Sequence, residues 1–175
     1  SAGGGDQHIR HALCEEAIRL ARLLLALFPA QGEVAGLLAL CLLQHSRHRA
    51  RIGPAGDLVP LNEQDRGIWD AEMIAEGLGL VEKALRKGRP GPLQIQAAIA
   101  AVHCSAASAD ETDWSEIDRL YAVLEAVQPT PVVTLNRAVA VSKVAGSAAA
   151  LDLIEPLAGP LARYQPFHST RAALL

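Results

Sequence analysis

The chain has 175 residues, with 16 Lys and Arg against 19 Asp and Glu, and a formal net charge of -3 at pH 7. Half of its residues are hydrophobic, which excludes a disordered tail, and the near balance of charge argues against a nucleic-acid-binding surface. No run reaches the roughly 18 apolar residues that a membrane helix needs, and no basic start leads into an apolar signal segment. We therefore expect a cytoplasmic protein that makes no membrane contact.

The composition also predicts the fold class. Ala occurs 32 times and Leu 26 times, so these two strong helix formers make up a third of the sequence. Residues that favour strands are scarce. We therefore expect an all-α fold of about eight helices in an antiparallel helical stack.

The N-terminal residues predict a flexible start followed by a long helix. Residues 1–5 are small and indicate a flexible linker outside the fold, while Asp6 can cap the helix. Apolar residues then recur at steps of four, three, four and three, namely Leu13, Ala17, Leu20, Leu24 and Leu27. This spacing is typical of one buried helix face.

Caps and helix-breaking residues divide the rest of the sequence. Asn62 and Asp65 are expected to open a long third helix, and Asp113 with Glu116 forms a capping box for the fifth. Thr130 can cap the sixth helix. The expected helices cover about residues 6–28, 33–43, 65–87, 93–104, 113–127, 131–143, 147–155 and 161–175.

We expect residues 6–175 to form a single helical domain with two parts. Residues 6–110 predict a helical bundle, and residues 111–175 predict consecutive helix pairs. Small residues at the expected helix crossings, such as Ala138, make these pairs similar to a right-handed tetratricopeptide repeat (TPR). The last pair is expected to be truncated at the C-terminus.

A polar cluster is expected at the start of the third helix. Asp65, Arg66 and Asp70 suit a helix N-terminus and can pair with one another. Trp69 beside them is expected to anchor the cluster to a neighbouring helix, and a ligand site is the alternative.

Polar residues also interrupt two apolar helices. Gln94, Gln96 and His103 lie on a helix built of Ala, Ile and Val, and Asn136 with Arg137 interrupts another. Buried polar groups must find partners, so these residues predict an interhelical network. A groove that recognises a partner segment is the alternative.

Histidines and cysteines form two trios at helical spacing. The trios are His8, His11 and Cys14, then Cys41, His45 and His48. Either could share a helix face as metal ligands do. Solvated or capping histidines beside packed, reduced thiols explain the same spacing, so we expect no metal and no cofactor.

Recognisable catalytic motifs do not occur in the sequence. We find no nucleophile elbow, phosphate-binding loop, dinucleotide fingerprint or zinc-protease motif. We therefore expect a protein that is not an enzyme.

The polar segments, taken in order, resemble the C-terminal extension of one group of extracytoplasmic-function (ECF) sigma factors. The resemblance covers roughly residues 12–175. The matching residues are Leu61, Gln64, Asp65, Arg66, Trp69, Asp70, Gly91, Pro92, Gln94, Gln96, Ala97, Ala98, Ile99, Ala100, Ala101, His103, Thr112, Asp113, Trp114, Pro131, Val132, Val133, Leu135, Asn136, Arg137, Ala138, Val139, Ala140, His168, Arg171 and Ala172. The sigma regions that grip polymerase and promoter would precede Asp6, and such extensions usually continue past residue 175.

The resemblance implies a regulatory, protein-interaction domain that supports transcription initiation. Its expected partners are the sigma regions of its own full-length polypeptide, core RNA polymerase, or both. Promoter DNA would be contacted only through the missing regions, and a homodimer is possible. The candidate interaction residues are Gln64, Asp65, Arg66, Trp69, Asp70, Gln94, Gln96, His103, Asp113, Trp114, Asn136, Arg137, His168 and Arg171. The alternative is a stand-alone TPR-like scaffold that binds a peptide or small ligand beside Arg66, Gln94 and Arg137.

Overall fold

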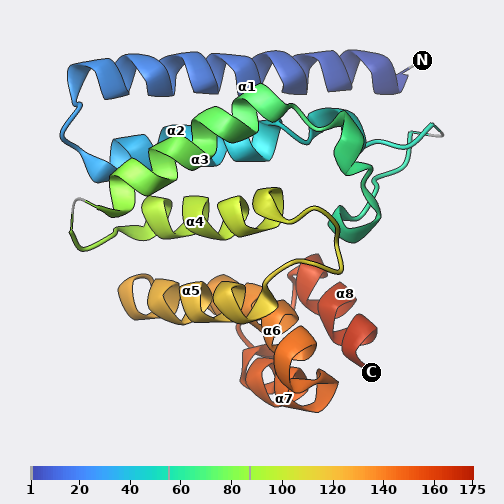
Figure 1. Ribbon diagram of the computed structural model, residues 1–175. Coiled ribbons are helices and arrows are strands. Elements are labelled where there is room, and N and C mark those ends of the chain that lie inside the picture. The colour runs from blue at the N-terminus through green and yellow to red at the C-terminus, as the bar shows by residue number, and fades with distance from the viewer. Residues whose placement is uncertain (1, 55, 87) are drawn as a thin grey trace. The chain divides into compact units, whose positions relative to one another are not determined.

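The computed structural model describes residues 2–54, 56–86 and 88–175, with side chains from residue 11 onward (Figure 1). The described residues form eight α-helices in two compact units, unit 1 (Ser1–Thr112) with α1–α4 and unit 2 (Asp113–Leu175) with α5–α8. Within each unit, consecutive helices pack in antiparallel fashion, so the all-α expectation is confirmed. The β-structure of the described residues is an isolated bridge between Ile52 and Leu58. No helix among them is long and apolar enough to cross a membrane.

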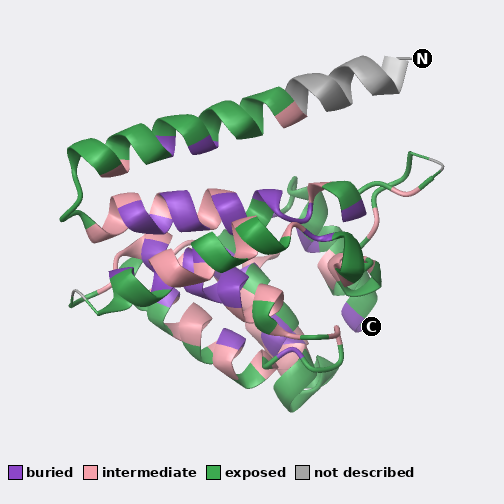
Figure 2. Cartoon of the chain, turned by 45° about the horizontal axis from the view of Figure 1, so that its top comes forward, coloured by how far each residue is buried: buried purple, intermediate pink, exposed green. Residues whose placement is uncertain are grey.

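Helix α1 (Ala2–Leu27) buries a different face from the expected one. Ile18 and Ala21 are buried against Leu38 and Leu42 of the next helix. The Leu stripe that was expected in the core is exposed, and α1 is mostly exposed in Figure 2. The prediction was wrong because two neighbouring faces of α1 are apolar, and the face with the small Ala21 makes the contact. The bounds of α1 include residues 2–5 and Asp6, whose side chains lie outside the described residues.

Helix α2 (Gly32–His45) is the centre of unit 1 and packs against α1, α3 (Ala71–Leu85) and α4 (Pro92–Ser105). Its Leu42 and Leu43 are fully buried. Two glycines permit these close crossings. A Cβ at Gly36 would lie 2.7 Å from the backbone nitrogen of Gln94, and one at Gly77 would lie 2.7 Å from Cγ of Leu43.

The segment between α2 and α3 contains three short 3₁₀ helices, η1 (His48–Ala50), η2 (Leu61–Glu63) and η3 (Arg66–Ile68). The third helix was expected from about residue 65, and this start was wrong. Asp65 caps η3 by accepting a hydrogen bond from the Gly67 nitrogen, whereas Asp70 caps α3 by accepting one from Met73. The backbone between these caps is extended at Trp69, which places the indole in the core.

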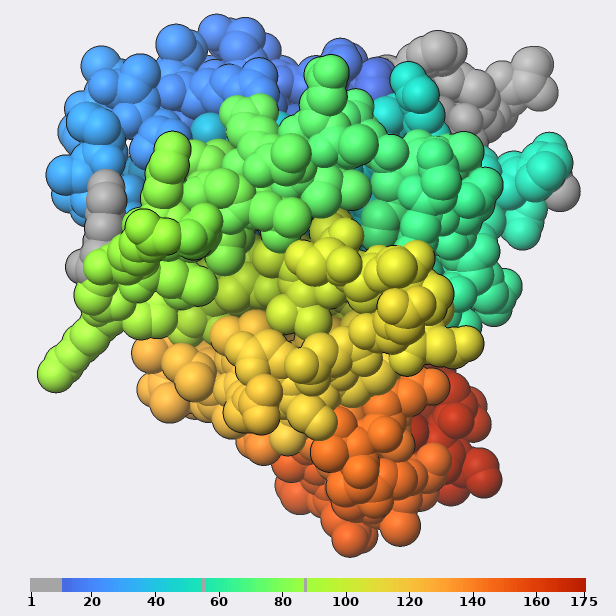
Figure 3. Space-filling model, in the orientation of Figure 1, coloured from blue at the N-terminus to red at the C-terminus, as the bar shows by residue number. Residues whose placement is uncertain are grey.

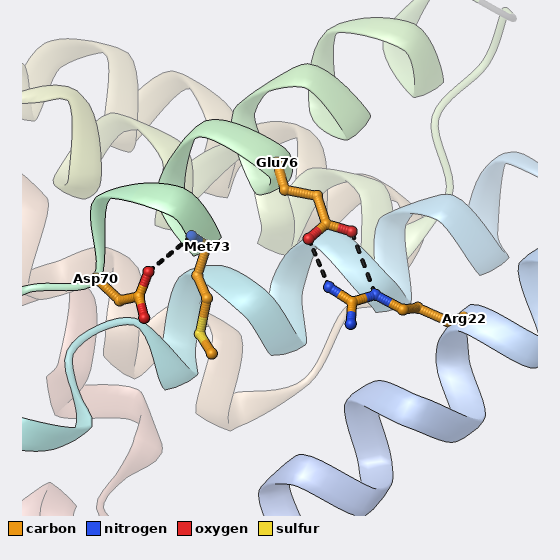
Figure 4. A network of polar contacts seen from close by, with 4 residues as sticks. All are labelled: Arg22, Asp70, Met73 and Glu76. Atoms are coloured by element: carbon orange, nitrogen blue, oxygen red, sulfur yellow. Dashed lines mark hydrogen bonds and ion pairs between the residues drawn. The ribbon is translucent and has the colours of Figure 1, made fainter.

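Helices α1 and α3 meet on the face of unit 1 that Figure 3 shows. Nη2 of Arg22 lies 2.6 Å from Oε2 of Glu76, and the guanidinium spans both carboxylate oxygens (Figure 4). Both side chains are largely exposed, so the pair contributes at most about 1 kcal/mol.

Unit 2 consists of α5 (Trp114–Val127), α6 (Pro131–Ala145), α7 (Ser147–Ile154) and α8 (Gln165–Leu174), with the 3₁₀ helix η4 (Glu155–Leu157) after α7. The expected N-caps form, since Asp113 accepts from the Glu116 nitrogen and Thr130 from the Val133 nitrogen. The Glu116 carboxylate accepts from Arg119 instead of completing the expected capping box. Gly146 has a φ of 90°, which suits the turn between α6 and α7.

The core of unit 2 surrounds Phe167, which is 2 % exposed. The other buried members of this core are Leu135, Ala138, Ala150, Ile154, Leu161 and Leu174. The last helix was expected from Leu161, but residues 158–163 form turns and α8 begins at Gln165. Leu161 is buried from a turn, so its apolar character indicated burial rather than helix. The TPR-like repeat stays a prediction.

Candidate functional site

Arg66 is the centre of the polar cluster of unit 1. Its Nη1 donates hydrogen bonds to the carbonyl oxygens of His103 and Ala106, at 2.5 and 2.9 Å. These carbonyls lie at the C-terminal end of α4, where helical hydrogen bonds run out. A cation there also complements the negative end of the helix dipole. The guanidinium of Arg66 therefore caps the C-terminal end of α4 and ties η3 to this helix.

Trp69 lies under this guanidinium and is 8 % exposed. Cζ of Arg66 is 4.5 Å from the centroid of the indole ring, and Cζ of Arg47 is 5.9 Å from it. Both distances are within the range of cation–π attraction. Arg47 is itself buried and donates a hydrogen bond to Gln44 at 2.6 Å. Two arginines thus lie against one aromatic ring, and this is the arrangement through which Trp69 would act as an anchor.

The other candidate residues of this segment bond to nearby backbone. Nε2 of Gln64 donates to the Val59 carbonyl at 3.0 Å, and Asp65 and Asp70 cap η3 and α3. The Asp70 nitrogen donates to the Ser46 carbonyl at 2.9 Å, which joins the start of α3 to the end of α2. These side chains hold the loop in place.

Burial and positive charge lower the pKa of His103 to about 4. Desolvation is the larger cause, and the charges of Arg47 and Arg66 add to it. Burial likewise raises the pKa of the neighbouring Cys104 thiol. Both groups are therefore neutral at pH 7, which suits a half-buried place beside two arginines.

Gln94 joins α3 to α4 and is 6 % exposed. Its Oε1 accepts a hydrogen bond from the Gly91 nitrogen at 3.1 Å, and its Nε2 donates to the Ala84 carbonyl at 2.9 Å. The amide group thus caps the start of α4 and the end of α3 at once. Gln96, on the same helix, is half-buried.

Glu33 of α2 completes this junction, and our sequence analysis gave it no role there. Its carboxylate accepts hydrogen bonds from the nitrogens of Leu93 and Gln94, at 3.2 and 3.1 Å. An acid at a helix N-terminus satisfies free donors and suits the dipole. The partners lie 60 and 61 residues away, so no local spacing could have identified the contact.

In unit 2, Arg137 joins α6 to α5. Its Nε donates to Oδ1 of Asp118 and its Nη1 to Oε2 of Glu125, both at 2.7 Å. These hydrogen bonds raise the pKa of Arg137 above its usual value, against the opposing effect of burial. Asn136 is exposed, so it is not a member of a buried network.

The remaining candidates of unit 2 lie nearer the surface. Trp114 is half-buried at the start of α5, directly after the Asp113 cap. His168 is exposed and its Nε2 lies 2.8 Å from the Ala162 carbonyl. Arg171 is exposed and lies 3.7 Å from Glu155. The predicted residues of unit 1 thus lie in two places, around Arg66 at the C-terminal end of α4 and around Gln94 at its N-terminal end, and those of unit 2 make separate contacts.

An exposed apolar face on α1 is the feature that the sequence analysis assigned to the core. Leu13 is 63 % exposed and Leu27 is 71 % exposed. We call the following residues the α1 face: Leu13, Leu20, Leu24 and Leu27. They recur at steps of seven, four and three, so they share one side of the helix. Leu23 and Phe28 are exposed beside them.

Comparisons with known proteins give a longer relative and a family match to the first half of the sequence. The chain is 56% identical over 175 residues to an uncharacterized protein of Rhizobium meliloti (strain 1021), covering 100% of this chain and 41% of that relative. The chain thus spans about two fifths of the length of the curated relative that it matches. No solved structure matches it. Residues 1–85 match the family described as "Family of unknown function (DUF6596)", and this part of the sequence is similar to that family.

Proposed function

We propose that the chain is the C-terminal regulatory, protein-interaction domain of an ECF-type sigma factor. The α1 face carries the proposal. Isolated exposed leucines are normal on a protein surface, but a contiguous apolar stripe is typical of a protein contact. Four leucines on one helix side, with Leu23 and Phe28 next to them, make such a stripe.

The occupant proposed for this face is the set of sigma regions of the same polypeptide. The curated relative is more than twice as long as this chain, so further polypeptide is available to cover the stripe. An intramolecular contact needs little intrinsic affinity, because a tether gives a high effective concentration. Core RNA polymerase would then be reached by the assembled factor, and promoter DNA only by its sigma regions.

Several residues that resemble the sigma-factor extension support the proposal indirectly, because they hold the helices of unit 1 together. Arg66, Trp69 and Asp70 hold the loop before α3, and Gln94 joins α3 to α4. Their hydrogen bonds go to protein groups within unit 1. Their role in the proposal is to hold α2, α3 and α4 as the platform on which α1 presents its leucines.

The proposed mechanism is docking, without a reaction and without a cofactor. The balance of charge, -3 in total, suits a module that does not itself hold DNA. Transcription takes place in the bacterial cytoplasm, which is the location proposed here. Regulation would follow from the equilibrium between docked and undocked arrangements.

A transcription assay on the full-length parent tests the proposal. We expect truncation before Asp6 to abolish promoter-directed transcription while the remaining sigma regions stay folded. The sharper test replaces two residues of the α1 face, Leu13→Ser with Leu27→Ser, in the full-length protein. The matched control is Leu58→Ser, at a loop leucine that is 80 % exposed.

The face variant is expected to lose most transcription and the control to keep it, with equal circular dichroism and equal melting temperature. Crosslinking between α1 and the sigma regions is expected in the parent and not in the face variant. Equal transcription by both variants would refute docking through α1. A change of oligomeric state in the face variant would instead assign the stripe to a second copy of the protein.

A further inference from the structure

Three imidazole rings meet where the N-terminal half of α1 lies against the end of α2. His11 belongs to α1, His45 is the last residue of α2, and His48 opens η1. The ring centroids lie 4.9 Å apart for His11 and His45, 4.8 Å for His11 and His48, and 4.6 Å for His45 and His48. We call these residues the histidine cluster.

The histidine cluster combines residues from both of the trios that the sequence suggests. It takes His11 from the first trio, and His45 with His48 from the second. His8 lies outside the residues whose side chains are described. The contact depends on how α1 packs on α2, so spacing within one helix could not reveal it.

The ring nitrogens of the cluster lie near enough to one another to serve as ligands of one metal ion. One ligand atom from each residue lies within 4.8 Å of the other two. Zinc binds nitrogen at about 2.0–2.1 Å in tetrahedral sites, which places two ligand nitrogens about 3.4 Å apart. The His45 and His48 rings are stacked, with 11° between their planes, so the partly exposed His11 and His48 side chains must rotate to bring the nitrogens to that separation around one ion.

The ring nitrogens that would not bind the metal have hydrogen-bond partners that suit a metal site. Nδ1 of His48 lies 2.9 Å from the His45 carbonyl, and donation there leaves the Nε2 lone pair available. The other ring nitrogen of a ligating histidine usually donates a hydrogen bond from its N–H to a carbonyl or carboxylate in this way. Nε2 of His11 lies 3.2 Å from Glu15, which can orient that ring by accepting a hydrogen bond.

His45 supplies an independent observation. The residue is 4 % exposed, and its Nε2 is buried without a hydrogen-bond partner. A buried polar atom without a partner is unfavourable and calls for a specific explanation. A metal ion bound at this nitrogen would satisfy it.

We propose that His11, His45 and His48 form a three-histidine site for a divalent transition-metal ion of the zinc class. Imidazole suits Zn²⁺, Co²⁺, Ni²⁺ and Cu²⁺, whereas Mg²⁺ and Ca²⁺ prefer oxygen ligands. Three protein nitrogens leave a fourth tetrahedral position for water or a further ligand. The ion would fasten the N-terminal half of α1 to α2. The proposal is independent of the proposed sigma-factor function.

Metal titration of the untagged, chelator-treated protein tests the site. We expect saturable binding of one Zn²⁺ per protein molecule by calorimetry, and a melting temperature that rises until the site is full. Co²⁺ is expected to give the intense visible bands of four-coordinate nitrogen ligation. The variants His11→Gln and His48→Gln, at partly exposed rings, are each expected to weaken Zn²⁺ binding about tenfold or more. His168→Gln, at an exposed histidine of unit 2, is the matched control and is expected to bind as the parent does.

Thiols are the competing ligands, because Cys14 lies near Cys41. The double variant Cys14→Ser with Cys41→Ser is expected to keep Zn²⁺ binding and to leave the Co²⁺ spectrum unchanged. The proposal is overturned if no saturable binding occurs up to millimolar Zn²⁺. It is equally overturned if both histidine variants bind as the parent does, or if the cysteine variant loses the ion.

Discussion

The guanidinium of Arg66 lies over the ring of Trp69 at 4.5 Å and donates to two carbonyls at the end of α4. One residue thereby joins the loop before α3 to a helix end 37 residues further along the sequence. The indole shields the guanidinium from water, which strengthens the hydrogen bonds that it makes.

Arg66→Met is expected to lower the free energy of unfolding of unit 1 by about 1–3 kcal/mol, because two carbonyls lose a charged donor. Arg66→Lys keeps the charge but not the planar group over the indole, so we expect it to recover only part of the loss. Urea unfolding followed by Trp69 fluorescence, in a Trp114→Phe background, measures both. Equal stability of the parent and Arg66→Met would contradict the capping role.

Gly36→Ala is expected to destabilise the protein by about 1–3 kcal/mol, as overpacking does. The added Cβ would lie 2.7 Å from the Gln94 nitrogen, and backbone cannot move aside as a side-chain tip can. The matched control is Gly79→Ala on α3, where a Cβ meets nothing within 4 Å. Alanine there is expected to add about 0.5–1 kcal/mol through helix propensity. Thermal and urea unfolding of the two variants should therefore move in opposite directions.

Stability is expected to fall as the pH falls from about 6.5 towards 4, because of His103. The unfolded state binds a proton at this residue below its ordinary pKa of about 6.5, whereas the folded protein holds the pKa at about 4. The unfolded state therefore binds more protons in this window, and stability rises with pH. The contribution is about 3 kcal/mol and is fully present well above pH 6.5.

His103→Gln is expected to flatten this pH dependence. Burial lowers the pKa of His45 as well, so part of the slope should remain. Urea midpoints at pH 7 and pH 4.5 measure the difference. A variant with the full slope of the parent would show that His103 is not the titrating group.

Arg137→Met is expected to lower the stability of unit 2 by about 1–2 kcal/mol, because Asp118 and Glu125 lose a shared, half-buried partner. Arg119→Met removes an exposed pair with Glu116 within α5, and no measurable change is expected there. Unfolding followed by circular dichroism compares the two. A double-mutant cycle with Asp118→Asn would give the coupling energy directly, and a value near zero would contradict the assignment.

Cys14 is expected to react first with an alkylating reagent in the native protein. It is exposed, whereas Cys41 and Cys104 are partly buried. Burial raises the pKa of both these thiols, so less of the reactive thiolate is present at them. Mass mapping after brief labelling at pH 8 gives the order in which the three thiols react. Labelling in urea should abolish the difference between them. Faster native labelling of Cys104 would mean that α4 opens readily.

Short-range sequence signals predicted which segments are helical and where several of the helices start. Asp113 and Thr130 cap the helices that follow them, and Gly146 turns the backbone before α7. Each of these signals acts within three residues of its source, so a single sequence contains it. The start of α3 was placed too early because Asp65 and Asp70 both carry capping chemistry, and only the packing of Trp69 separates them.

Which faces of the helices pack together could not be predicted from the sequence. Helix α1 has two apolar sides, and only its fit on α2 selects Ile18 and Ala21 over the α1 face. The contact of His11 with His45, at the end of α2, and with His48 of η1 depends on the same fit. The residues of the Arg66 cluster were identified by type and order, but their hydrogen-bond partners are distant in sequence.

The carboxylate of Glu33 satisfies the first turn of α4 from another helix, and this has a consequence for how unit 1 forms. Two nitrogens of the first turn of α4 find their acceptor only on α2, so α4 gains its full stability only after α2 has docked. The isolated segment 86–112 should accordingly be weakly helical. Opening of α4 and of α2 should appear in hydrogen exchange as one event rather than two.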